Sequence, residues 1–273
     1  MPRVKFGICS EIFKDWNDIA RTIHFVKETG YDGLEVAPFT FAPFVTDISQ
    51  DTRTEIVKRA AEADLDILGI HWVFVGPDGV HLTHPDPAIR RFTATYLKAL
   101  VDFCGDIGGK IIVFGSPKQR NVEEGVTYDQ AFGYARAIFE EAMPVCEARG
   151  VTICMEPLTH LETNFLQSAA ETVTLVDAVG HPNFQLILDT KAMTFEQDNR
   201  PTLIRRYADK MKHYHANDEN MHGPGFGEVD FAPIFEALKE IQFGGYVSVE
   251  VFNFEPGPEA IAQKSLAYMK QFV

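Results

Sequence analysis

Eight short runs of branched apolar residues recur along the chain, and their even spacing is the feature that most restricts its fold. Each run has the length and composition of a β-strand that is buried on both faces. The runs are VKFGICS (4–10), GLEVA (33–37), DILGIHWVF (66–74), KIIVFGS (110–116), VTICMEP (151–157), FQLILDT (184–190), MKHYHAND (211–218) and YVSVEVF (246–252). Segments with helical periodicity and charged faces separate these runs. The clearest are 15–29, 52–63, 88–107, 128–149, 169–179, 231–241 and 259–271.

Strands that alternate with helices form parallel βαβ units, and eight such units favour a closed α/β barrel, the (β/α)8 TIM barrel. Glycines at helix-to-strand joints, such as Gly30, Gly150 and Gly180, suit the left-handed position that often ends a helix. The rival architecture is a doubly wound open sheet. Its nucleotide-binding form has a glycine-rich loop after the first strand, but here that loop reads CSEIFKDW. We therefore predict a TIM barrel.

Length and composition favour one barrel domain over residues 1–273, because 45% of the residues are hydrophobic and can fill a large core. The formal net charge of −14 opposes binding to nucleic acid or to an anionic membrane. Charged residues interrupt the N-terminal segment before any long apolar run, so we expect neither a signal peptide nor a membrane span, and a cytoplasmic location. The four cysteines form no CxxC pair and no Cys/His cluster, and we expect them to be free and buried.

Ionisable side chains stand at the carboxyl ends of the last four predicted strands, the end at which TIM barrels carry their active sites. They are Glu156, Asp189, His215 and Glu250. A single strand-end acid often caps a helix or pairs with a lysine, and for one carboxylate alone that interpretation is preferred. Four such groups on successive strands are costly to hold together without a cation between them.

The sequence therefore predicts a site for one divalent metal ion. Three carboxylates and one imidazole favour Mn²⁺ and also suit Mg²⁺ or Co²⁺, while the donor set alone excludes neither Zn²⁺ nor Fe²⁺. His213 shares a strand face with His215 by the two-residue repeat, and we interpret it as a core histidine with a partner.

These residues and their surroundings resemble the sugar isomerase and epimerase barrels of the xylose isomerase-like superfamily, particularly the D-tagatose 3-epimerase branch. The similarity covers nearly the whole chain. Its specific parts are Glu156-Pro157-Leu158 followed by Glu162, Leu188-Asp189-Thr190, His213-Tyr214-His215, the segment Pro224-Gly225-Phe226-Gly227-Glu228-Val229-Asp230, and Gly245-Tyr246 leading to Glu250.

The resemblance implies that Glu156, Asp189, His215 and Glu250 bind the metal and that Glu156 and Glu250 are the catalytic acid/base pair. In that chemistry the metal stabilises an enediolate, while one carboxylate removes a proton and the other returns one to the opposite face. The resemblance also implies that Glu162 binds the substrate; a loop acid that faces solvent is the alternative. The expected substrate is a keto-sugar, a sugar phosphate or a related polyol derivative.

Two positions depart from the pattern of those epimerases and bear on the substrate. Where they carry a histidine after the aspartate of the sixth strand, this chain has Ala192, and where they carry an arginine after the metal histidine, it has Met221. Other polar groups could replace this clamp. We expect substrate contacts from His71, Lys118 and Lys191, although charged loop residues in solvent are the simpler interpretation of the two lysines.

Several alternatives remain open at this stage. A lyase or dehydratase acting on a keto-sugar or keto-inositol would use the same enediolate, and only the substrate separates it from an epimerase. An endonuclease IV-like nuclease is opposed by Ala192 and by the acidic charge balance. A non-catalytic barrel is opposed by the complete ligand set. The aromatic residues Phe39, Phe41, Phe44 and Trp72 could shape the pocket, cover it or form a contact in a homo-oligomer.

Overall fold

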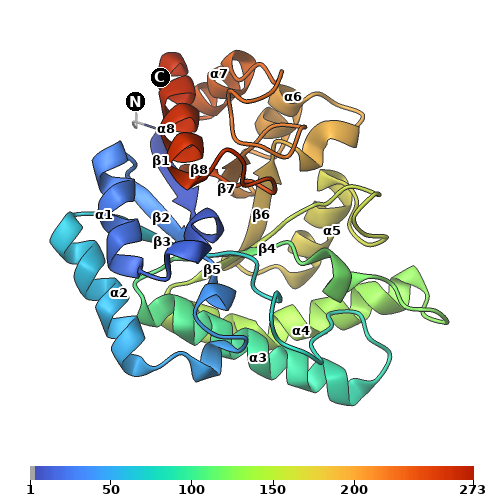
Figure 1. The fold of residues 1–273 in the computed structure, drawn as a ribbon. Coiled ribbons are helices and arrows are strands. Elements are labelled where there is room, and N and C mark those ends of the chain that lie inside the picture. The colour runs from blue at the N-terminus through green and yellow to red at the C-terminus, as the bar shows by residue number, and fades with distance from the viewer. Residues whose placement is uncertain (1–3) are drawn as a thin grey trace.

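The computed structural model describes residues 4–273 and forms a closed barrel of eight parallel strands (Figure 1). Each strand pairs with the next along the chain, and β1 closes the barrel against β8. The strands are β1 (Lys5–Cys9), β2 (Gly33–Val36), β3 (Asp66–Ile70), β4 (Ile111–Phe114), β5 (Thr152–Met155), β6 (Phe184–Asp189), β7 (Met211–Ala216) and β8 (Tyr246–Val249). The predicted (β/α)8 barrel is therefore confirmed, and each strand lies within one of the eight apolar runs.

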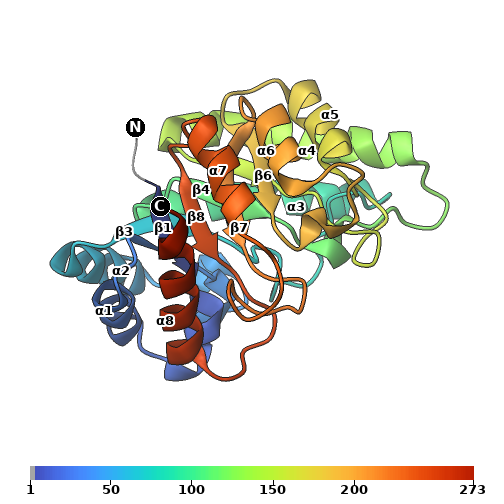
Figure 2. The same ribbon diagram turned by 90° about the horizontal axis from the view of Figure 1, so that it is seen from above.

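Helices surround the strands (Figures 1 and 2). Residues from these helices belong to the buried hydrophobic core. They are α1 (Ile19–Thr29), α2 (Gln50–Ala63), α3 (Pro87–Asp106), α4 (Tyr128–Arg149), α5 (Ala169–Val179), α6 (Arg200–Arg206), α7 (Ala232–Glu240) and α8 (Pro258–Met269). Helix α6 was not predicted. Its seven residues, RPTLIRR, give too few turns for a recognisable apolar repeat, and only Leu203 and Ile204 are buried.

Glycine allows the barrel wall to close tightly between β3 and β4. A Cβ atom at Gly69 would come within 1.8 Å of the carbonyl oxygen of Ile111, which is backbone and cannot rotate away. The absence of a side chain at this position therefore permits the pairing of Gly69 with Ile111 in the strand register.

Short 3-10 segments follow several strands at the carboxyl end of the barrel and position the residues discussed below. They include η1 (Ser10–Trp16), η2 (Pro38–Thr40), η4 (Pro117–Arg120) and η5 (Ala192–Phe195). All four cysteines are free and buried, as predicted. Among the residues that the structure describes, no helix is long and apolar enough to cross a bilayer.

Candidate metal centre

Four consecutive strands bring Glu156, Asp189, His215 and Glu250 together at the carboxyl end of the barrel. Asp189 ends β6 and pairs in register with His215 of β7, whereas Glu156 and Glu250 directly follow β5 and β8. One side-chain donor atom from each residue lies within 4.8 Å of the others, and all four side chains are buried. The structure thus assembles the whole group that the strand ends predicted.

The carboxylates of this group repel one another in a buried setting. Burial, with the charges of Glu250 and Asp189, raises the pKa of Glu156 well above its ordinary value. Burial and the charge of Glu250 also raise the pKa of Asp189 to about 6. Burial opposes the ionisation of Glu250 as well, but the adjacent His215 holds its pKa below the ordinary value. A nearby positive charge would stabilise the ionised forms of Glu156 and Asp189.

The two nitrogens of the His215 imidazole face different carboxylates, Glu35 on one side and Glu250 on the other. Its Nε2 lies 3.1 Å from Oε1 of Glu35, and its Nδ1 lies 3.0 Å from Oε2 of Glu250. Glu35 also accepts a hydrogen bond from Nε2 of His213 at 2.8 Å. Burial opposes the charge on Glu35, but His213 and His215 hold its pKa well below the ordinary value. An ionised Glu35 keeps a proton on Nε2 of His215. The unprotonated Nδ1 then faces the carboxylates of the candidate metal centre.

Hydrogen bonds fix the carboxylate of Asp189 and the backbone of Glu156. Asp189 accepts hydrogen bonds from the backbone N–H of Ala192 at 2.6 Å and from the side-chain amide of Asn217. The backbone carbonyl of Glu156 accepts a hydrogen bond from Arg120 at 2.6 Å. A Cβ atom at Gly115 would lie 2.3 Å from Oε2 of Glu156, so this glycine leaves the space that the carboxylate occupies.

This donor set fits a divalent metal ion. Three carboxylates and the Nδ1 atom of His215 converge, and the raised pKa values of Glu156 and Asp189 show that the ionised forms of these two acids are disfavoured. Glu35 orients the imidazole as metal-bound histidines require. Glu156, Asp189, His215 and Glu250 are the residues that would hold the ion. An oxygen-rich set of this kind suits Mn²⁺, Mg²⁺ or Co²⁺ and also accepts Zn²⁺.

A cavity of about 240 Å³ opens beside this group and is lined by Glu156, Asp189 and Glu250. Glu162 and Lys191 also line it, and their charged ends form an ion pair at 2.6 Å. Most of the remaining wall is apolar and is formed by Trp72, Val75, Val113, Pro117, Leu158 and Phe252, with Gly115 and Ser116 beside them. Two of the residues expected to contact substrate, Glu162 and Lys191, are therefore placed where a ligand would meet them.

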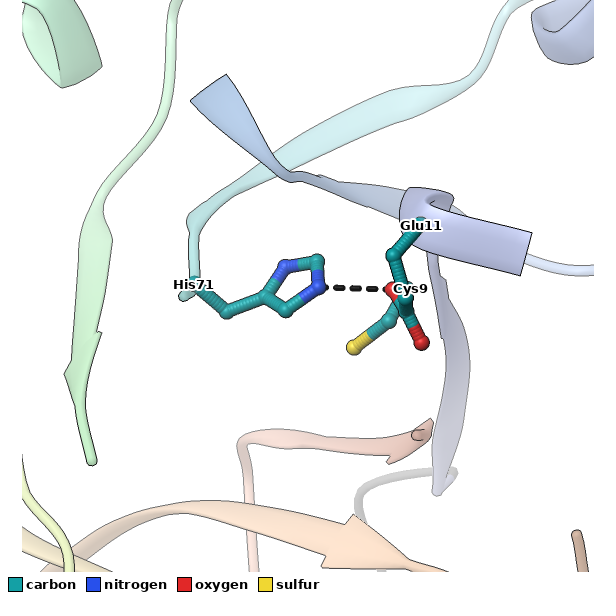
Figure 3. A group of neighbouring side chains, drawn as sticks. All are labelled: Cys9, Glu11 and His71. Carbon is teal, nitrogen blue, oxygen red and sulfur yellow. Dashed lines mark hydrogen bonds and ion pairs between the residues drawn. The ribbon is translucent and has the colours of Figure 1, made fainter. Parts of the chain in front are cut away.

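The other two residues expected to contact substrate lie elsewhere. Lys118 is exposed on η4 and is not part of the cavity wall. His71 is fully buried, and its Nε2 lies 2.7 Å from Oε2 of Glu11, with the thiol of Cys9 beside the pair (Figure 3). The cavity is walled instead by its neighbour Trp72. His213 is a buried core histidine paired with Glu35, as predicted.

Arg120, two residues after Lys118, is not part of the cavity wall. Its guanidinium is fully buried and donates to the backbone carbonyls of Glu156 and Leu166. These hydrogen bonds place the guanidinium in the protein interior, where a buried polar group needs partners.

Glu35 and Glu11 were not predicted from the sequence to be partners of buried histidines. Each is a fully buried acid, and each is paired with a histidine that is distant in sequence. The available signal was an isolated carboxylate among apolar residues, in GLEVA for Glu35 and in ICSEIF for Glu11. Such an acid needs a buried partner, but the sequence does not say which one.

Comparison with known proteins assigns the family. The family model described as xylose isomerase-like TIM barrel matches residues 23–272. The chain belongs to this family. The fold and the resemblance expected from the sequence are both confirmed.

Members of the family with assigned activities match over most of their length. An L-ribulose 3-epimerase from Methylomonas sp. is 32% identical over 88% of this chain and 82% of its own. A D-psicose 3-epimerase from Ruminiclostridium cellulolyticum is 28% identical over 88% of this chain and 80% of its own. A 3-dehydro-D-guloside 4-epimerase from Escherichia coli is 26% identical over 98% of this chain and 99% of its own. These relatives confirm an enzyme of the sugar isomerase and epimerase class.

Solved structures show the same fold. A 3-keto-D-glucoside 4-epimerase from E. coli superimposes with a TM-score of 0.85 at 20% identity, covering 98% of this chain and 100% of the other. A D-psicose 3-epimerase from Clostridium cellulolyticum, solved with D-tagatose, superimposes with a TM-score of 0.83 at 23% identity, covering 98% of each chain.

Replacing Glu35 should weaken metal binding. Glu35→Gln removes the negative charge and leaves one acceptor oxygen for two histidines, so the proton is held less firmly on Nε2 of His215. We expect the affinity for Mn²⁺ to fall by about 10- to 100-fold, as for other partners of metal-bound histidines. Titration calorimetry on metal-free protein measures this affinity. Glu11→Gln is the matched control, because it also removes a buried carboxylate paired with a histidine but leaves His215 untouched; an equal loss in both variants would contradict the role of Glu35.

Metal binding should also depend on pH. Because Asp189 has a pKa raised to about 6 by burial and by Glu250, it is ionised above that pH and protonated below it in metal-free protein. An ion must displace this proton, so the affinity for Mn²⁺ should fall by about tenfold or more between about pH 7 and about pH 5. Calorimetry in two buffers of different ionisation enthalpy would measure the proton released. An affinity that stays constant across this range would contradict the assignment.

Proposed function

We propose that the protein is a metal-dependent epimerase that inverts a carbon next to the carbonyl of an uncharged keto-sugar. The observation that carries the proposal is the arrangement of two carboxylates, Glu156 and Glu250, from strands β5 and β8, which line the same cavity within one candidate metal site. The epimerase activities of the relatives, which are named for D-psicose and L-ribulose, support the same class of reaction.

The charges around the cavity favour a substrate without phosphate or carboxylate. Four acids line the cavity: Glu156, Glu162, Asp189 and Glu250. Lys191 is the one lysine or arginine among the described residues that line it, and its charge is neutralised by Glu162 at 2.6 Å. Because Lys191 is already paired with Glu162, the lining residues that the structure describes offer no free lysine or arginine side chain to bind a phosphate or carboxylate group.

The two carboxylates would divide the proton transfer between them. A divalent ion bound at this place would withdraw electrons from a carbonyl and its neighbouring hydroxyl group and so acidify the C–H bond between them. One of Glu156 and Glu250 removes that proton, and the other supplies a proton to the opposite face of the carbon. The bond that breaks is re-formed with inverted configuration, and no atom is gained or lost overall.

The two carboxylates can be tested separately. Glu156→Gln and Glu250→Gln keep the size of each side chain and one oxygen donor but remove the base, so each should slow proton exchange by about 10²-fold or more. Exchange is measured by NMR as deuterium incorporated from deuterated water into keto-sugars, at saturating Mn²⁺ with occupancy checked by elemental analysis.

Each variant should block exchange from one epimer more than from the other, because each carboxylate serves one face. Near wild-type exchange in either variant would remove that glutamate from the mechanism. Loss of a water molecule from the substrate, in place of exchange, would make the enzyme a dehydratase.

A further inference from the structure

The indole of Trp72 donates a hydrogen bond to the carboxylate of Glu250 and lines the cavity beside it. We propose that Trp72 is a positioning residue that holds one oxygen of Glu250 for proton transfer while the other oxygen stays with the metal ligands. This inference rests on the proposed function, since it assigns a task within the same proton transfer.

The two oxygens of Glu250 have different partners. Oε1 accepts a hydrogen bond from Nε1 of Trp72 at 2.8 Å, whereas Oε2 lies 3.0 Å from Nδ1 of His215. Oε2 therefore belongs to the metal-ligand group, and Oε1 is directed toward a residue that lines the cavity. A carboxylate that binds through one oxygen can rotate about its terminal bond, and the indole N–H removes this freedom.

The position of Trp72 is itself fixed. Its ring stacks on Phe39 at 5.7 Å and on Phe252 at 6.1 Å between centroids, with interplanar angles of 19° and 23°. Its backbone has a φ of +52°, in the left-handed region that residues with a Cβ rarely occupy. Such a conformation costs free energy and persists only where surrounding contacts enforce it, which is typical of functional sites.

The side chain is also suited to this task by chemistry. An indole N–H donates and cannot accept, so it interacts with the ionised carboxylate without competing for the substrate proton. Its ring forms part of the apolar cavity wall, together with Val75 and Phe252. The same residue thus orients Oε1 and bounds the space in which the reacting carbon would lie.

Trp72→Phe tests the proposal because it removes the N–H donor. The smaller phenyl ring can still stack on Phe39 and Phe252. We expect kcat for proton exchange to fall by about tenfold or more, the loss expected for a hydrogen bond to a charged group. The affinity for Mn²⁺ should fall by less than kcat does, because the indole contacts Oε1 of Glu250 and not the Oε2 that lies beside His215. The loss should fall on the same epimer as the loss in Glu250→Gln, which a merely structural role would not produce.

Trp16→Phe is the matched control. Trp16 is the only other tryptophan, packs on Phe13 and Phe25, and makes no contact with the candidate metal centre, so its replacement should leave exchange and Mn²⁺ affinity unchanged. Equal losses for both epimers in Trp72→Phe, or a parallel loss of Mn²⁺ affinity, would overturn the positioning role.

A second measurement separates this inference from the proposed function. In Trp16→Phe protein loaded with Mg²⁺, the indole ¹H–¹⁵N resonance of Trp72 should move when Glu250 is replaced by Gln, because its acceptor loses its charge. An unchanged resonance would overturn the contact itself, whatever the substrate. A shifted resonance in an enzyme that exchanges no proton in any keto-sugar would instead refute the proposed function and, with it, the catalytic task given to Trp72.

Discussion

Repulsion among three buried carboxylates is the constraint on which the rest of the site depends. Glu156, Asp189 and Glu250 come from different strands, and the closed barrel holds their donor atoms within 4.8 Å of one another and of His215. Isolated charges in such a place are strongly unfavourable, and the raised pKa of Glu156 and of Asp189 records this. A divalent cation bound among these carboxylates would offset their repulsion and stabilise the arrangement.

A surrounding shell of hydrogen bonds gives these donors their directions. Glu35 fixes the proton on His215, Asn217 holds Asp189, and Trp72 holds one oxygen of Glu250. The residues of this shell come from strands and loops on different sides of the barrel. They reach the ligands only when the barrel is closed, so the fold itself orients the ligands. Rigid strands carry the ligands, while the loops that follow them shape the cavity.

The sequence was sufficient to predict the barrel and the four candidate ligands because both depend on local signals. Strand periodicity marks the eight runs, and the rule that barrel active sites lie at the carboxyl ends of strands selects Glu156, Asp189, His215 and Glu250. The short helix α6 (Arg200–Arg206) carried too few apolar positions to be recognised. The partners of buried groups were also beyond local reasoning. Glu35 meets His213 and His215 across 178 and 180 residues of sequence, a contact fixed by how the barrel closes.

The central claim is that one divalent ion lies among Glu156, Asp189, His215 and Glu250. Anomalous diffraction from crystals soaked in Mn²⁺ tests it most directly, because the signal locates manganese without reference to any activity. The account predicts one peak in contact with a side-chain atom of each of these four residues, with His215 bound through Nδ1. A peak at another place, contact through Nε2 of His215, or no peak in fully soaked crystals would contradict it.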